Sequence, residues 1–249
     1  MSNILRFLLA ICIISHLVAC FSLESKSKLK LAKRIETVNW YQQKKNCNQQ
    51  TLTTNNCPSF KFDGITFKHQ PLLNNLIEQK LLSLVKAKNQ SLWDYQQSYL
   101  AKAHNGDHIY FTVKVLKQTT ALTVLQLSCE EQHSTYVYST PNIAFINFDN
   151  QTKQDLQLTD IIQGDQLPAF WSNAQLVYNQ WLEVNQLLNN EVYHQDWPFV
   201  KTPHFALLTN GITLQYEANT LAPYAMGMPT LVIPYNKLEG IVKPQYIIN

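Results

Sequence analysis

The chain has 249 residues, of which 45% are hydrophobic and 11% aromatic, so it has enough apolar material for one good core. Residues 1–45 hold eight Lys and Arg against two Glu, so the formal net charge of +3 hides a net charge of −3 on residues 46–249. Arg34 is the only arginine after Arg6. Because bidentate recognition of phosphates and bases depends on arginine, the composition argues against nucleic acid as a partner.

The N-terminus has the pattern of a bacterial export signal. Arg6 is followed by an apolar run from Phe7 to Ala19, which is too short to span a bilayer as a stable helix. The run ends in Leu-Val-Ala-Cys, which resembles the lipobox of bacterial lipoprotein signal peptides and implies that Cys20 is lipid-modified. An ordinary secretory signal, in which Cys20 is incidental, is the alternative. By resemblance to lipoprotein sorting rules, Phe21 favours the outer membrane, with the protein facing the periplasm.

Residues 1–19 are therefore predicted to be a signal peptide, and residues 20–45 a lipid anchor with a basic tether. Basic residues beside a lipid anchor suit anionic headgroups, although a solvated basic linker explains the same composition. No later segment approaches the length of about eighteen apolar residues that a membrane helix needs. The sequence thus predicts contact with the membrane through the N-terminal lipid.

Three cysteines remain after the signal and the anchor. Cys47 and Cys57 bracket a polar stretch and are predicted to form a disulfide in an oxidising periplasm. Cys129 follows a strand-like stretch and is predicted to be a free, semi-buried thiol. The chain has neither a Cys-x-x-Cys pair nor Cys/His zinc spacing, so no metal and no cofactor are predicted.

The middle of the chain changes from helical to strand periodicity. Helical spacing predicts one amphipathic helix starting at Pro71 and a second, shorter helix capped by Ser91 with Asp94 three residues later. The apolar face of the first helix consists of Leu72, Leu73, Leu76, Ile77, Leu81, Leu84 and Val85, with Lys80 beside them. Alternation then predicts an antiparallel meander of strands at residues 108–118, 120–128, 134–140 and 142–149.

Helical periodicity returns at residues 164–188, where Phe170, Ala174, Val177, Trp181 and Leu188 are predicted to face inward. Strands at 204–208, 212–216 and 230–235 follow, the first two joined by an Asn210-Gly211 hairpin. These elements predict an α+β fold: a mainly antiparallel sheet with two or three helices on one face. The fold is expected to be one compact unit of two sequence halves, residues 46–130 and 131–243, with a tail at 244–249.

The stretch Leu221–Gly227, which reads LAPYAMG, predicts a rigid corner between two strands. Pro223 fixes its own φ and pushes Ala222 out of the helical region, and Gly227 can adopt a positive φ. Tyr224 has an apolar body and a hydroxyl that needs a partner. A corner that closes the core and a surface that contacts a ligand are both open interpretations of this stretch.

The segment from Tyr216 to Leu238 resembles the C-terminal motif of an exported domain family, DUF3298, known from RsiV-type anti-sigma factor ectodomains and PdaC-type peptidoglycan deacetylases. The matching residues are Tyr216, Ala222, Pro223, Tyr224, Ala225, Gly227, Ile233, Pro234, Tyr235 and Leu238. Upstream, Asn147, Phe148, Asp149, Leu156, Leu158, Asp160 and Ile161 resemble a further family segment, and the helix from Leu72 matches the preceding DUF4163-like half. One departure stands at Glu130–His133, where the family has Gly-Gly-Ala-His and this chain keeps only the histidine.

The resemblance implies a binding module of the cell envelope that recognises lysozyme, as RsiV ectodomains do, or peptidoglycan. In PdaC-type proteins the chemistry belongs to a separate deacetylase domain that has no counterpart here, so no catalytic residue is predicted. The alternative is an envelope hydrolase with a site centred on His133. His104, Asp107 and His108 could clamp a metal, but Asn105-Gly106 between them is an ordinary turn signal.

A partner surface is predicted along the corner formed by Tyr216, Tyr224 and Tyr235, with His133 nearby. Tyrosines on a corner fixed by Pro and Gly would lose little entropy on binding. The competing interpretation is that these rings belong to the core. Of the three, Tyr216 is the stronger candidate for a contact with a partner, and Tyr224 the stronger candidate for a core residue.

Overall fold

The structure is a computed structural model that describes residues 35–45, 47, 56–134 and 141–247. Its strands are β1 (Ile35–Gln43), β2 (Ser59–Phe67), β3 (His108–Gln118), β4 (Leu122–Gln132), β5 (Asn142–Asp149), β6 (Gln154–Asp155), β7 (Phe205–Leu208), β8 (Gly211–Gln215) and β9 (Thr230–Ile233). Its α-helices are α2 (Pro71–Leu84), α3 (Leu92–Lys102), α4 (Leu158–Ile161), α5 (Leu167–Val184) and α6 (Glu191–Asp196). Short 3-10 turns are η2 (Tyr224–Met226), η3 (Tyr235–Lys237) and η4 (Pro244–Tyr246).

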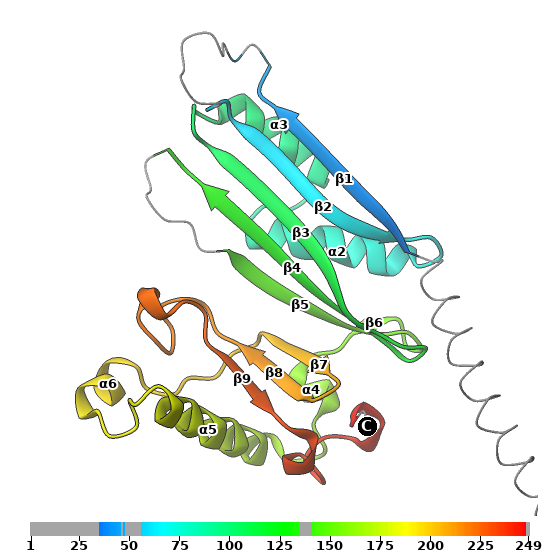
Figure 1. Cartoon of the computed structure of the whole chain (residues 1–249). Coiled ribbons are helices and arrows are strands. Elements are labelled where there is room, and N and C mark those ends of the chain that lie inside the picture. The colour runs from blue at the N-terminus through cyan, green and yellow to red at the C-terminus, as the bar shows by residue number, and fades with distance from the viewer. Residues whose placement is uncertain (1–34, 46, 48–55, 135–140, 248–249) are drawn as a thin grey trace, which may run out of the picture.

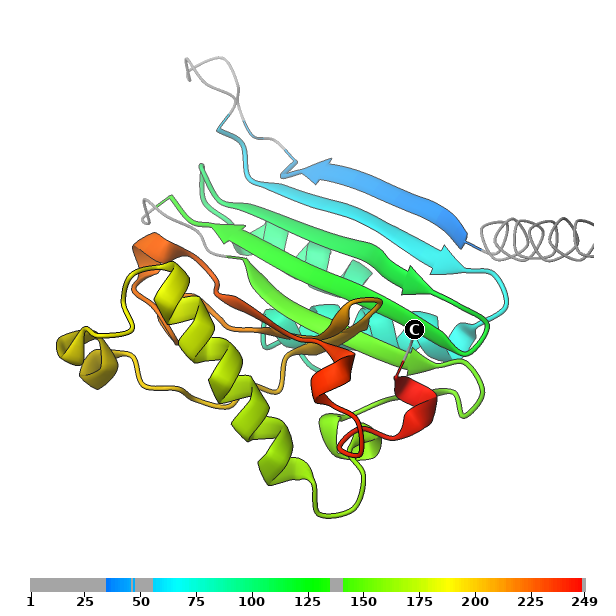
Figure 2. The ribbon, with the colours of Figure 1, turned by 60° about the horizontal axis from the view of Figure 1, so that its bottom comes forward.

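The strands form two sheets, which together with their helices define two lobes. The large lobe is the six-stranded sheet, in the order β1-β2-β3-β4-β5-β6, with α2 and α3 on one face (Figure 1). The small lobe is the three-stranded sheet β7-β8-β9 with α4, α5 and α6; its sheet lies between α5 and the large sheet (Figure 2). Strands β2 and β3 run parallel, and all other neighbouring pairs are antiparallel. The predicted α+β class with a mainly antiparallel sheet is confirmed, with two sheets in place of one.

The large sheet separates two hydrophobic cores. Phe60, Phe111 and Leu127 face α2 and α3 and are fully buried with them. Val124 and Phe145 belong to the second core, which is completed by α5 and the three-stranded sheet. The middle of the large sheet is therefore covered on both faces, which explains why β5 contains the apolar run Ile143–Ile146 and why Val124 and Leu125, neighbours in β4, are both fully buried.

Helix α2 buries a narrower face than the sequence suggests. Its buried side chains are those of Leu73, Ile77, Leu81 and Leu82. The prediction that Leu72 faces inward is wrong: its side chain is 58% exposed, because it lies one position off the buried row at the first turn. The capping box predicted for α3 is confirmed, since Ser91 Oγ accepts the backbone N–H of Asp94 at 3.1 Å.

Helix α5 ends earlier than predicted. It stops at Val184, so Leu188 lies beyond the helix and is exposed rather than inward-facing. Phe170 and Ala174 are fully buried as predicted. Val177 and Trp181 are only partly buried, because the inward stripe follows the residues next to them; these are Trp171, Tyr178 and Leu182.

The predicted tether at residues 20–45 is wrong for its last part, because Ile35–Gln43 is β1, paired with β2 over nine consecutive positions. Val38 and Trp40 alternate with polar residues and face the helices, a period-two signal that the basic composition obscured. The predicted signal peptide and Cys20 lie outside the described residues. So does the strand predicted at 134–140, from residue 135 onward.

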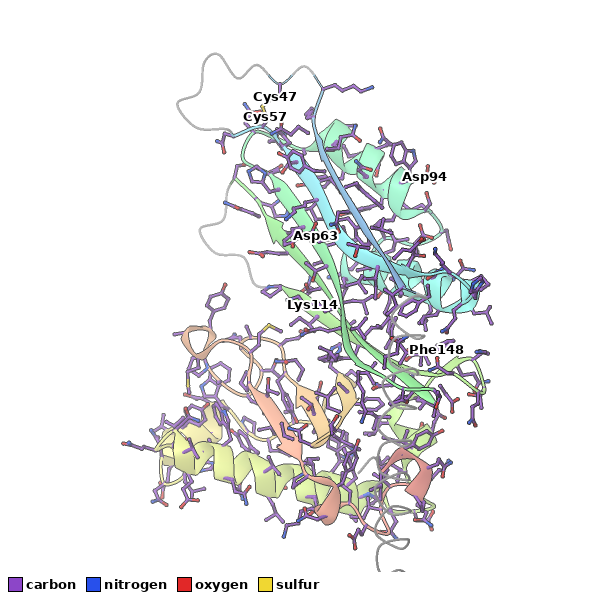
Figure 3. All side chains as sticks on the ribbon, turned by 45° about the vertical axis from the view of Figure 1, so that its right-hand side comes forward. Cys47, Cys57, Asp63, Asp94, Lys114 and Phe148 are labelled. Carbon is purple, nitrogen blue, oxygen red and sulfur yellow. A yellow bond between two sulfur atoms is a disulfide. The ribbon has the colours of Figure 1, made fainter. Side chains whose placement is uncertain are left out.

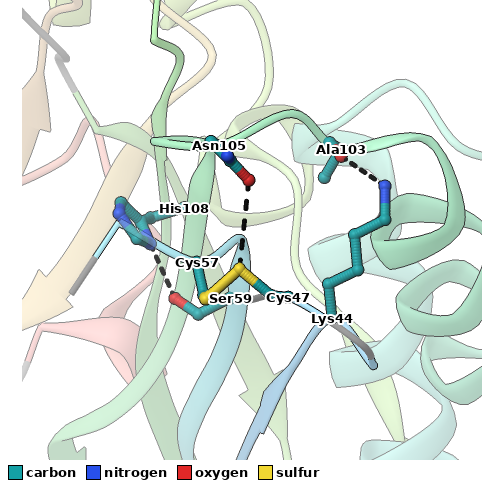
Figure 4. The surroundings of a disulfide bond; sticks show 7 residues. All are labelled: Lys44, Cys47, Cys57, Ser59, Ala103, Asn105 and His108. Atoms are coloured by element: carbon teal, nitrogen blue, oxygen red, sulfur yellow. Dashed lines mark hydrogen bonds between the residues drawn. A yellow bond between two sulfur atoms is a disulfide. The ribbon is translucent and has the colours of Figure 1, made fainter. Parts of the chain in front are cut away.

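The predicted Cys47–Cys57 disulfide is confirmed, with the two Cα atoms 5.8 Å apart, and Figure 3 shows it at one end of the large sheet. Closing a loop with a sequence separation of 10 stabilises the fold by about 2–3 kcal/mol through the unfolded state. The turn beside the disulfide is held by the Gly106 backbone N–H, which donates to the Asn56 carbonyl oxygen at 2.7 Å. Cys47 Sγ lies 3.9 Å from Asn105 Oδ1 of the same turn (Figure 4). Cys129 is free as predicted, but it is fully buried rather than semi-buried.

One buried amide connects the two lobes. The Asn147 side chain on β5 donates to the Phe205 carbonyl oxygen at 2.9 Å and accepts the Leu207 backbone N–H at 2.9 Å. It thus pairs with the edge of β7 as a neighbouring strand would. Asn147 is only 2% exposed, so these two bonds form away from water.

Candidate functional site

The three tyrosines predicted to form a platform do not lie together on the surface. Tyr216, at the end of β8, has no exposed surface, and Tyr235 is 7% exposed. Tyr224, in η2, is 42% exposed. The prediction of a shared tyrosine surface is therefore wrong for Tyr216 and Tyr235, and the expected order is reversed, because Tyr224 is the one that reaches solvent.

The buried tyrosines fill the small lobe. The Tyr235 hydroxyl donates to the Leu208 carbonyl oxygen at 2.8 Å, and burial raises the pKa of Tyr235 to about 12, so the hydroxyl remains a donor in neutral solution. The Tyr216 hydroxyl is buried and has no hydrogen-bond partner among the described residues. Gly227 has a φ of +74°, which confirms that LAPYAMG is a corner closed by a glycine in the left-handed region.

His133 lies beside two carboxylates at the end of β4. Its Nε2 is 3.4 Å from Glu131 Oε2, and its Nδ1 is 3.9 Å from Asp107 Oδ1. Asp107 is buried and accepts the backbone N–H groups of Ser134 and His104 at 3.0 and 2.7 Å. Burial acts to raise the pKa of Asp107, but these hydrogen bonds outweigh it and hold the pKa below its usual value.

The contacts of Asp107 and His133 are those of residues that stabilise a turn, and they do not form a hydrolytic site. The Asp107 carboxylate is occupied in ordering the chain around the predicted Asn105-Gly106 turn, where Gly106 has a φ of +91°. The nearby Cys129 thiol is buried, and burial together with the neighbouring Glu131 raises its pKa, so it remains protonated and a poor nucleophile. Within the described residues no group of three or more His, Cys, Asp or Glu is arranged to hold a metal ion.

A cavity between the two lobes is a better candidate site. Its volume is about 530 Å³, within the range of small-molecule pockets. The large lobe lines it with the end of α2 and the start of β5, and the small lobe with residues that flank β7 and β8. We call this cavity the interlobe cleft; the residues used below are Lys80, Lys86, Ile143, Phe145, His204 and Glu217.

The floor of the interlobe cleft is apolar and its two rims carry different charges. Ile143 and Phe145 supply the floor from β5. On the large lobe, Lys80 Nζ lies 3.1 Å from Asp155 Oδ2, and Lys86 is exposed and forms no ion pair within the described residues. On the small lobe, His204 Nε2 is 3.6 Å from Glu217 Oε1. The cleft can thus receive a carboxylate at one rim and an amine at the other.

Sequence reasoning missed the interlobe cleft entirely. Its residues come from separate segments that lie together only in the folded chain, where the Asn147 side chain joins β5 to β7. No local motif marks them. Lys86 is unusual in its φ of +55° just after the end of α2, but this backbone angle can be seen only in the structure.

Comparisons with known proteins agree with this architecture. Residues 148–236 match the family model described as a protein of unknown function, DUF3298. No curated protein matches the chain. Among the described residues no helix is long and apolar enough to cross a membrane.

Two solved structures cover most of the chain. A DUF3298 family protein from Pseudomonas aeruginosa PAO1 is 32% identical, with a TM-score of 0.80 over 86% of this chain and 96% of that one. A member of the same family from Bacteroides fragilis NCTC 9343 is 18% identical, with a TM-score of 0.65 over 84% and 93% of the two chains, and this likeness concerns the fold alone. The 32% identity across most of both chains shows that this chain belongs to the DUF3298 family.

Proposed function

We propose that this chain is a non-catalytic, lipid-anchored binding module of the RsiV/PdaC type in the cell envelope. We further propose that its ligand is peptidoglycan, held by a stem peptide in the interlobe cleft. The observation that carries the proposal is the composition of that cleft: an apolar floor between a lysine rim and a His204–Glu217 rim. A stem peptide carries free carboxylates, an amine and short apolar side chains, which match the charged rims and the apolar floor.

Two features of the sequence support the location. The Leu-Val-Ala-Cys pattern that ends at Cys20 favours a lipid anchor, and Phe21 favours the outer membrane with the domain facing the periplasm. A domain tethered there meets peptidoglycan at high local concentration, so a modest affinity per site is sufficient. Labelling cells with a radioactive fatty acid tests the anchor, and an unlabelled protein that is unaffected by Cys20→Ala would contradict it.

The binding test uses the full-length chain in mild detergent and muropeptides with and without their stem peptides. Titration calorimetry should detect binding only when the peptide is present. Lys86→Gln should weaken binding by roughly three- to tenfold, because it removes one exposed charge from the rim. Lys88→Gln is the matched control, because Lys88 is also exposed but does not line the cleft.

Lysozyme is the alternative partner that the resemblance to RsiV suggests. The net charge of −3 on residues 46–249 is compatible with a strongly basic enzyme. Lysozyme is a protein and too large to enter a cavity of about 530 Å³, so its binding should be unaffected by muropeptides. Capture of lysozyme together with no response to any muropeptide would replace the peptidoglycan proposal.

A further inference from the structure

Strand β1 leaves the large sheet with an open edge. It is the first strand in the sheet order, and no described element lies along its outer side (Figures 1 and 2). In an antiparallel sheet half of the backbone N–H and C=O groups of an end strand point away from its neighbour. Over nine residues, β1 therefore presents a row of hydrogen-bonding groups that a further strand can use.

β1 lacks the features that usually prevent an edge strand from pairing with another molecule. The strand contains no Pro, Gly or Lys, and its pairing with β2 runs without a bulge. Its only charged residue, Glu36, is engaged by Lys68, whose Nζ lies 2.7 Å from Glu36 Oε1. The edge is thus regular and nearly neutral, which is the condition under which strands pair between molecules.

An apolar gap runs beneath the same edge. A cavity of about 270 Å³ opens between β1 and the helices, lined by Val38, Trp40, Ile65, Ile77, Leu81 and Leu92. The Trp40 indole stacks on Phe60 with ring centroids 6.0 Å apart and packs at a tilt of 33° against Phe62, with centroids 4.6 Å apart. Its Nε1 is buried without an acceptor among the described residues. A strand added at β1 can supply apolar side chains to this gap and an acceptor to the indole.

We propose that β1 is a dimerisation strand, and that its partner is β1 of a second copy of this chain, paired antiparallel about Asn39. Full overlap of two nine-residue strands centres on that residue. Glu36 then faces the neutral Gln42 of the other copy, so the only charges in the strand do not meet. Val38 faces Trp40, and Thr37 faces Tyr41, pairs of β-branched and aromatic residues that stabilise antiparallel strands. The result is one continuous sheet through both molecules.

Cysteine cross-linking tests the register. Asn39→Cys puts two thiols on directly opposed residues, whose Cα atoms lie about 4.5–5.5 Å apart, within disulfide range. Tyr41→Cys is the matched control on the same face of β1, where the two thiols are about 13 Å apart along the strands. After mild oxidation of the full-length chain, the Asn39 variant should give at least about fivefold more disulfide-linked dimer than the Tyr41 variant.

Charge substitution tests the dimer without new thiols. Asn39→Lys places two like charges opposite each other and should convert the chain to a monomer, whereas Tyr41→Lys, opposite Thr37, should remain dimeric. Mass is measured by light scattering corrected for detergent, and circular dichroism verifies that each variant is folded. A monomeric wild-type chain, equal cross-linking of the two cysteine variants, or attachment of a different protein's strand at β1 would overturn the proposal.

Discussion

The edge strands of the two sheets differ: β7 is covered within the molecule, whereas β1 is not covered by any described segment. The β7 edge of the small sheet is buried, and the Asn147 amide pairs with its backbone through two hydrogen bonds of 2.9 Å. The β1 edge of the large sheet has no described segment beside it and carries an exposed Tyr41, 58% of whose surface is accessible. At β7, one side chain satisfies the backbone hydrogen-bonding groups of the edge strand within the molecule. At β1, the backbone groups of a regular and nearly neutral edge strand remain available to a second molecule.

This contrast predicts that stability resides in the closed region and that association depends on the open one. Tyr216→Ala should have the largest effect, because it removes a fully buried ring from the small lobe. We expect a loss of about 3–5 kcal/mol in the free energy of unfolding, measured by urea titration. The matched change at the open edge, Tyr41→Ala, should lower it by less than about 1 kcal/mol. Equal losses would remove the distinction between the two regions.

Asn147→Ala tests the closed edge itself. It leaves the Phe205 carbonyl and the Leu207 N–H buried without partners, which should cost about 2–4 kcal/mol in the free energy of unfolding. Asn39→Ala, an asparagine on the open strand, should change the free energy of unfolding by no more than about 0.5 kcal/mol. Urea titration at low protein concentration keeps association from contributing to the comparison.

The same contrast explains how far the sequence could be interpreted. Periodicity predicted α3 and strands β3, β4 and β5 because each signal lies within one segment. A hairpin does join β7 to β8, but its two-residue loop is Thr209–Asn210 rather than the predicted Asn210-Gly211, because Gly211 is the first residue of β8 and pairs with Leu208. The pairing of β2 with β3, the Asn147 bridge and the interlobe cleft involve residues far apart in the chain, and no local pattern encodes them. The sequence motif drew attention to Tyr216 and Tyr235 as contacts for a partner. Their large rings instead fill the packed core beside the corner, which is why both are buried.

The hydroxyl groups of these two tyrosines give a finer test within the closed lobe. Tyr235→Phe removes a hydrogen bond to the Leu208 carbonyl and should lower the free energy of unfolding by about 1 kcal/mol. Tyr216→Phe removes a buried hydroxyl that has no partner among the described residues, so it should be neutral or slightly stabilising. Thermal melts of both variants measure the difference. A larger loss for Tyr216→Phe would reveal a bound water or ligand at that hydroxyl.

The smallest expected effect concerns Asp107, at the end of the large sheet next to the disulfide. Its carboxylate is buried with His104 and His133 beside it, and it accepts two backbone N–H groups. Despite the opposing effect of burial, these bonds hold its pKa below the ordinary value. A group whose pKa is lowered in the folded state stabilises the fold above its unfolded pKa of about 3.9, and the stabilisation disappears as pH falls towards the folded pKa.

The free energy of unfolding of the wild-type chain should therefore fall as the pH is lowered from 5 to 3. The fall should be larger than that of the Asp107→Asn variant by up to about 1 kcal/mol. The asparagine cannot ionise but keeps one oxygen as a hydrogen-bond acceptor. Urea titrations of the two chains at each pH measure this difference. Because Asp107 orders a turn rather than closing an edge, its removal should leave both the interlobe cleft and pairing at β1 unchanged. If Asp107→Asn instead abolished dimer formation, the end of the large sheet and its open edge would have to be treated as one cooperative unit.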